Sequence, residues 1–125
     1  MAITLDHTIV PSHEQDAGAR FFAEVFDLDY DGSGHFAPVR VNETMTLLFS
    51  DQDSVKGQHY AFVVDEDEFD AIFARIQGSD ITYGSAPFSP DDGQLNTRRG
   101  GRGVYFRGGP DPHLWEIMTR AETGA

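Results

Sequence analysis

Two histidines and one glutamate, each in a different apolar segment of the chain, have the chemistry of a metal site. His7 lies in ITLDHTIV, His59 in GQHYAFVV and Glu116 in HLWEIMT. Two neutral imidazoles and one carboxylate make the facial triad, which holds a divalent ion on one side and leaves its other positions open for substrate. Metal ligands need only converge in space, so we expect neighbouring strands of one sheet to turn these three side chains the same way.

Each of the three residues also has an alternative role without a metal. A lone strand histidine such as His7 or His59 is often a buried side chain with ordinary hydrogen bonds. Glu116 lies between Trp115 and Ile117 in an apolar strand, where an ionised carboxylate is costly unless it is paired or bound to a metal. For this glutamate the alternative is a salt bridge to an arginine of the preceding loop.

That loop, residues 85–103, is the second part of the chain whose side chains could bind a substrate. It is rich in Gly and Asp, it has no periodicity, and loops of this length are usually functional or disordered. It holds Arg98, Arg99 and Arg102 in a chain with nine basic residues. Since guanidinium groups suit carboxylate or phosphate, we expect these arginines, together with Asn96, to bind an anionic part of a substrate. The alternative is that the arginines pair with the many acidic residues of this chain or with a partner subunit.

Composition narrows the class of protein. The 125 residues suffice for one domain with a packed core, and the net charge of −12 argues against binding to nucleic acid or to an anionic membrane surface. The absence of cysteine excludes disulfides and thiolate metal sites. We see no signal peptide and no apolar run long enough to span a membrane, so a cytoplasmic protein is expected.

The elements that position these residues follow one order twice. Residues 3–10 alternate as a strand does, and residues 13–27 have the apolar spacing of a helix, with Ser12 and Gln15 at the spacing of a capping box. Two further strands are predicted over residues 35–41 and 44–50.

After a polar linker the same order begins again. Residues 59–64 are a predicted strand, and Asp65 with Glu68 forms a predicted capping box for a helix that ends at Gly78. More strands are predicted over residues 81–83, 104–107 and 113–119. The pattern therefore predicts two βαβββ copies.

This arrangement resembles the vicinal oxygen chelate superfamily, which includes glyoxalase I, extradiol dioxygenases, fosfomycin-resistance proteins and bleomycin-binding proteins. The resemblance rests on LDHTIV, ARFFAEVFDL, HYAFVVDEDEFDAIFARI, GGRGVYF and PDPHLWEIM in this order. It implies the α+β glyoxalase/bleomycin resistance/dioxygenase fold: a single domain over 1–125, whose two βαβββ modules, about 1–52 and 58–122, form a curved mixed sheet. It also implies a homodimer.

The resemblance implies site residues as well. His7, His59 and Glu116 fall on three ligand positions of the family, and Tyr105 on a position for an acid or hydrogen-bond donor beside the metal. The alternative for Tyr105 is an ordinary aromatic residue of the sheet. Many relatives have a fourth ligand where this chain has Leu48, so the four-ligand glyoxalase I pattern is broken. The remaining set is closer to that of extradiol dioxygenases and fosfomycin-resistance enzymes.

One turn departs from the family pattern. Relatives usually have a glycine just before the histidine that precedes the glutamate strand, and this chain has Pro112 there. Because proline cannot take a positive φ, we expect the turn to differ locally and to use the extra glycine nearby.

The predicted function is a divalent-metal-dependent enzyme whose small-molecule substrate binds through vicinal oxygens, with extradiol-dioxygenase-like or glyoxalase/lyase-like chemistry. The ligand set suits Fe, Mn, Ni or Zn equally. The alternative function is a metal-free antibiotic-binding protein like the bleomycin-resistance members, for which an acidic protein would suit a cationic drug.

Overall fold

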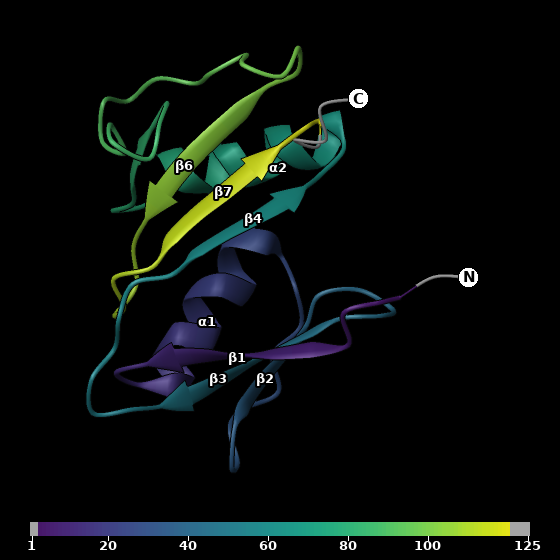
Figure 1. Ribbon diagram of the computed structural model, residues 1–125, viewed down its shortest axis with the longest axis vertical. Helices are drawn as coiled ribbons and strands as arrows, with labels where there is room; N and C mark the ends of the chain where they lie inside the picture. The colour runs from purple at the N-terminus through teal and green to yellow at the C-terminus, as the bar shows by residue number, and fades with distance from the viewer. Residues whose placement is uncertain (1–2, 121–125) are drawn as a thin grey trace. The chain divides into compact units, whose positions relative to one another are not determined.

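The computed structural model describes residues 3–120, and their strands form one sheet of three strands and one of four (Figure 1). The chain divides into two compact units. The first runs to Lys56 and includes Gly109–Asp111, and the second comprises Gly57–Gly108 and the residues from Pro112 onwards. Each unit has one helix and a sheet of mixed direction, which confirms the predicted α+β class with mixed sheets. No helix within residues 3–120 is long and apolar enough to cross a membrane.

The first unit has two strands after its helix. Its elements are β1 (His7–Ser12), α1 (Gln15–Phe26), β2 (Ala37–Arg40) and β3 (Thr46–Asp51). The strand order is β1-β3-β2, with β1 parallel and β2 antiparallel to β3. Alternate residues such as Val10 and Phe49 are buried under α1, where the rings of Phe22 and Phe49 lie 6.0 Å apart. The other face of this sheet carries His7.

The predicted capping box of Ser12 and Gln15 is wrong. Ser12 is the last residue of β1, and its hydroxyl donates to Asp111 Oδ2 at 2.6 Å. The N-terminus of α1 is instead stabilised by a residue distant in sequence, because Gln15 N donates to Asp51 Oδ1 at 2.7 Å. The Gln15 side chain returns the interaction by accepting from Asp51 N at 3.0 Å. A reciprocal pair therefore caps this helix across 36 residues of chain.

The turn before the glutamate strand uses the extra glycine, as expected. Gly109 has a φ of +74°, which is the left-handed conformation that proline cannot adopt. The two following residues include Asp111, which accepts from Ser12 Oγ and from His13 N at 2.7 Å. The turn is thus tied to the end of β1.

The second unit has the full βαβββ order. Its elements are β4 (His59–Val63), α2 (Glu66–Gln77), β5 (Thr82–Gly84), β6 (Gly103–Arg107) and β7 (Leu114–Met118). The strand order is β4-β7-β6-β5, with β4 parallel to β7 and the other pairs antiparallel.

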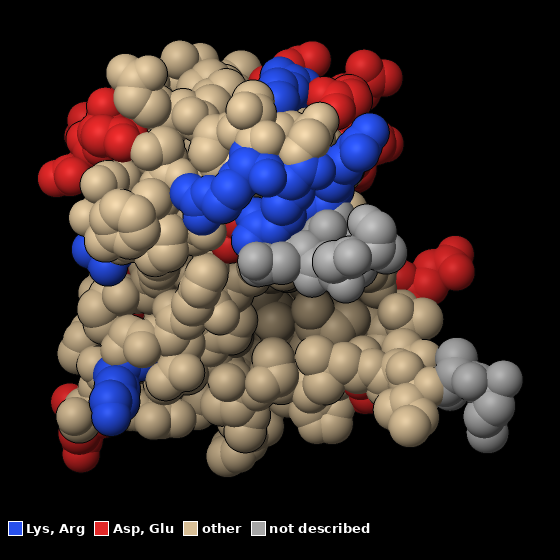
Figure 2. All heavy atoms as spheres, turned by 45° about the horizontal axis from the view of Figure 1, so that its top comes forward, with Lys and Arg blue, Asp and Glu red and all other residues tan. Residues whose placement is uncertain are grey.

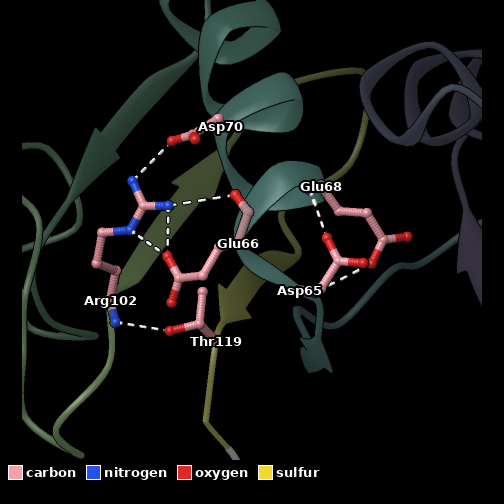
Figure 3. A network of polar contacts seen from close by, with 6 residues as sticks. All are labelled: Asp65, Glu66, Glu68, Asp70, Arg102 and Thr119. Atoms are coloured by element: carbon pink, nitrogen blue, oxygen red, sulfur yellow. Dashed lines mark hydrogen bonds and ion pairs between the residues drawn. The ribbon is translucent and has the colours of Figure 1, made fainter.

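Both predicted ends of α2 are confirmed. Glu68 N donates to Asp65 Oδ1 at 2.8 Å, and Asp65 N donates to Glu68 Oε1 at 3.0 Å, so the capping box is complete (Figure 3). The helix ends at Gln77, and Gly78 is its C-cap, whose N–H bonds to the carbonyl of Ala74.

Strand register decides which side chains share a face of the four-stranded sheet. Tyr83, Phe106 and Trp115 are partners across β5, β6 and β7 and therefore point the same way. The ring of Phe73 on α2 meets Tyr83 edge to face with a centroid distance of 5.2 Å, so this row faces α2. Figure 1 shows α2 lying along that one face of the sheet. Residues at alternate positions, Tyr105 and Glu116 among them, occupy the opposite face.

Candidate functional site

Glu116 is the centre of the candidate site. It occupies the middle of β7, and its side chain is only 2% exposed. The register pairs it with Tyr105 on β6 and with Ala61 on β4. The sheet therefore places a carboxylate on its helix-free face with neighbours from two adjacent strands.

His59 reaches this carboxylate from the start of β4. It lies two residues before Ala61 and so shares the face of Glu116. Its Nε2 is 3.0 Å from Glu116 Oε1, and its side chain is 46% exposed. The structure thus brings together two of the three predicted metal ligands, with the imidazole at the surface and the carboxylate beneath it.

Arg99 contacts the other oxygen of the same carboxylate. Its Nη1 lies 3.4 Å from Glu116 Oε2, and its side chain is 15% exposed. This is the salt bridge to a loop arginine that the sequence offered as the alternative role of Glu116. A buried carboxylate requires a partner, and here a guanidinium and an imidazole supply it.

Tyr105 adds a proton donor to the cluster. Burial raises the pKa of its phenol above the ordinary value of 10.0, and the negative charge of Glu116 and a hydrogen bond to that carboxylate raise it further. The positive charge of Arg98 partly opposes this shift in pKa. The phenol is therefore protonated at neutral pH. The Tyr105 ring lies 5.6 Å from the ring of His59.

The loop that carries the arginines is held by its own hydrogen bonds. Asn96 and Gly103 exchange two backbone hydrogen bonds of 2.9 Å, which close the segment between them. The carbonyl of Ser85 accepts from Asn96 Nδ2 at 3.0 Å and from Arg98 Nη2 at 2.6 Å. The Arg98 guanidinium lies 5.9 Å from the centre of the Tyr105 ring. Asn96 thus orders the loop, and Arg98 lies at the edge of the Glu116 cluster.

Arg102 takes the alternative role that the sequence left open for the loop arginines. Its guanidinium binds Glu66 Oε1 at 2.7 Å and Asp70 Oδ1 at 2.8 Å, one turn apart on α2 (Figure 3). It also lies over the ring of Phe69 at 4.4 Å. Figure 2 shows one large group of basic side chains with acidic side chains beside it, and further basic side chains that lie apart from this group. The spacing of Glu66 and Asp70 puts both carboxylates on one side of the helix, but it does not identify Arg102, 36 residues after Glu66, as their partner.

Several solved structures resemble the chain over nearly all of its length. It is 40% identical to "Oxidase ChaP-H2", with all of both chains covered and a TM-score of 0.90. It is 41% identical to "Oxidase ChaP-H1" over 96% of this chain and 98% of that chain, with a TM-score of 0.88. Fosfomycin resistance protein FosX from Mesorhizobium loti shares the fold at 19% identity over 99% and 98% of the two chains, with a TM-score of 0.70. The chain belongs to the vicinal oxygen chelate superfamily. No protein-family model and no curated protein sequence matched it.

At the position on β3 where many vicinal oxygen chelate proteins have a fourth metal ligand, this chain has Leu48. Thr46 is the register partner of His7, and Leu48, two residues on, is the partner of Ile9. Leu48 therefore shares a sheet face with His7 and offers no donor atom there.

His7 itself is paired with the residue before it. Its Nδ1 lies 2.8 Å from Asp6 Oδ2, and its side chain is 57% exposed. In metal sites, a histidine ligand usually donates a hydrogen bond from one ring N–H to a carboxylate, and this orients its other ring nitrogen towards the metal. Asp6 was not among the predicted site residues, although it directly precedes His7 in the sequence.

The His59–Glu116 pair fits a divalent ion. Two adjacent ligands of an octahedral ion, each about 2.1 Å from it, are about 3.0 Å apart, and the His59 Nε2 and Glu116 Oε1 atoms are separated by 3.0 Å. Within residues 3–120 no group of three or more histidine or acidic side chains is arranged to hold an ion. The same 3.0 Å contact is also that of a hydrogen bond, so the metal-binding roles of His59, Glu116 and His7 stay predictions.

Proposed function

We propose that this vicinal oxygen chelate protein is a metal-dependent enzyme that oxidises a small molecule with two adjacent oxygen atoms. The observation that carries the proposal is the His59–Glu116 pair, whose 3.0 Å spacing fits neighbouring ligands of one ion. The 40% identity to a protein named an oxidase, over the whole of both chains, favours oxidation over the glyoxalase/lyase-like alternative.

In this proposal His7, His59 and Glu116 would hold the ion. A bound divalent ion supplies Lewis acidity, and Fe(II) supplies redox chemistry with dioxygen as well, whereas Mn, Ni or Zn ions would favour proton transfer or addition. Glu116 would bind the ion from within the sheet face, and His59 would present its Nε2 from the surface side.

The surrounding residues act on the substrate in different ways. Tyr105 keeps its proton at neutral pH, so it donates a hydrogen bond to a substrate oxygen on which negative charge develops. Arg98 and Arg99 attract an anionic oxygen to the same place. Asn96 and Arg102 are engaged in contacts within the unit and serve by holding the loop that carries the other two arginines.

The test is the metal content of protein purified without chelators, compared among wild type, His7→Ala, His59→Ala and Glu116→Ala. We expect near-stoichiometric metal in the wild type and its loss in all three variants. His35→Ala, at an exposed histidine in a turn, is the matched control and should retain the metal. Oxygen consumption with catechol-type compounds and Fe(II) then tests the reaction class.

A metal-free binding protein is the second candidate, because the carboxylate of Glu116 already has Arg99 and His59 as partners. If the purified protein holds no metal, and added Fe(II), Mn(II), Ni(II) or Zn(II) gives no thermal stabilisation, the enzyme proposal fails. Calorimetric titration with a cationic antibiotic would then test the binding function, for which the net charge of −12 is suitable.

A further inference from the structure

The two oxygens of Glu116 have different partners in the four-stranded sheet. Oε1 faces His59 Nε2 at 3.0 Å, and Oε2 faces Arg99 Nη1 at 3.4 Å. The first contact has the spacing of two ligands on one ion. The second places a fixed positive charge on the carboxylate that the ion would also need.

Arg99 is brought to this position by a tight turn with an anchor. Gly100 has a φ of +80°, and a Cβ on Gly101 would clash with Thr119 Oγ1, so both positions favour glycine. The anchor follows directly, since Arg102 N donates to Thr119 Oγ1 at 2.9 Å and its guanidinium binds two carboxylates of α2 (Figure 3). The loop is therefore fixed three residues beyond Arg99.

A guanidinium and a divalent ion cannot share this carboxylate without cost. Two positive groups within a few ångströms repel, and the repulsion is screened less where the side chains are buried. Glu116 is 2% exposed and Arg99 15% exposed, so little solvent separates the charges. Each cation alone neutralises the carboxylate, so the two are alternatives.

We propose that Arg99 and the metal exchange at Glu116. In this proposal the Arg99 guanidinium neutralises the carboxylate through the 3.4 Å contact whenever no ion is bound. When the ion binds, Arg99 leaves Glu116 Oε2 and its charge becomes available to an anionic oxygen of the substrate. This inference rests on the proposed metal-dependent function and assigns to Arg99 a role in metal affinity as well as in substrate binding.

The first experiment is a calorimetric titration of metal-free protein with Mn(II), for wild type, Arg99→Gln and Arg98→Gln. Arg99→Gln should bind Mn(II) about tenfold more tightly than wild type, within the range usual for coupled sites. Arg98→Gln removes the same charge from the neighbouring residue, whose guanidinium binds the Ser85 carbonyl, and should change the affinity much less. Unchanged or weaker binding by Arg99→Gln would overturn the exchange.

A second measurement uses the wild-type protein and does not depend on the folding of a variant. With nitrogen-15 arginine, the side-chain signals of Arg99, assigned by comparison with Arg99→Lys, should shift when Zn(II) is added. Those of Arg102, held by Glu66 and Asp70, should stay in place. Metal binding without a response of Arg99 contradicts the inference alone. No binding by wild type or by either variant contradicts the proposed function itself.

Discussion

Tyr105 shows how one residue reports on the charges of the site. Burial and the nearby carboxylate of Glu116 raise its pKa, whereas Arg98 lowers it. We predict that Glu116→Gln moves this pKa down towards the ordinary value of about 10 and that Arg98→Gln moves it up. The measurement is an absorbance titration of tyrosinate in each background, with the matching Tyr105→Phe protein subtracted. Equal shifts in both variants would contradict the assigned charges.

The same shift fixes the sign of a stability effect. The pKa of Tyr105 is higher in the folded than in the unfolded protein. The protonated phenol therefore makes its full contribution to the free energy of unfolding below pH 10, and this contribution is lost as the pH rises through the folded pKa. In Tyr105→Phe the free energy of unfolding should therefore fall less steeply with pH in the alkaline range. Its dependence on pH near neutrality should be the same as in the wild type.

The pairing of Glu116 with Arg99 should appear as an energetic coupling. Glu116→Gln removes the counter-charge of a largely buried guanidinium, and in metal-free protein we expect it to cost about 1–3 kcal/mol in urea unfolding. In the double variant with Arg99→Gln, the loss should fall short of the sum of the single losses by at least about 0.5 kcal/mol. Strict additivity would show that the two side chains do not interact.

At the scale of elements, the caps of the two helices rest on different kinds of contact. For α2 the capping box is local, so Asp65→Ala should cost about 1 kcal/mol in unfolding free energy. Asp67→Ala is the matched control, since Asp67 lies in the same first turn and favours the helix dipole without closing the box. If Asp65→Ala and Asp67→Ala lower the free energy of unfolding equally, the negative charge stabilises the helix and the hydrogen bonds of the capping box contribute nothing.

This contrast explains what the sequence could and could not predict about the fold. The box at Asp65 and Glu68 depends on residues three apart, so its spacing was sufficient. The start of α1 depends on Asp51, 36 residues from Gln15, and no local pattern identifies such a partner. Ser12 is a residue type that often caps helices, and it has the right spacing from Gln15. However, β1 extends through Ser12, and its hydroxyl donates to Asp111 instead.

The site follows the same division. That His59 and Glu116 share a face was expected from the family resemblance, because strand periodicity is local and the β4–β7 register joins segments distant in the sequence. Which loop arginine meets Glu116 was not predictable. That choice depends on the bonds between Asn96 and Gly103 and on the anchoring of Arg102 to α2.

At the scale of the whole molecule, the proposed ligands come from both units of the chain. His59 and Glu116 belong to the second unit and His7 to the first. The homodimer implied by the family resemblance also stays a prediction at this scale, and sedimentation velocity with and without metal would measure it. Exposed apolar side chains in the first unit, such as Leu5 and Ile9, are consistent with further burial in an assembly.

If His7, His59 and Glu116 all bind the metal, as proposed, metal binding should stabilise each of the strands that carry them. Binding to the folded state alone raises stability by about 2.7 kcal/mol at a ligand concentration one hundred times Kd. We therefore predict that Zn(II) slows hydrogen exchange in β1 as well as in β4 and β7, measured by mass spectrometry of the corresponding peptides. In His7→Ala the protection of β1 should disappear while weaker protection of β4 and β7 remains, because two of the three donors are still present. His35→Ala should behave as wild type. If Zn(II) protects β4 and β7 in the wild type and leaves β1 unchanged, His7 is not a ligand, and the ion is held by the second unit and solvent.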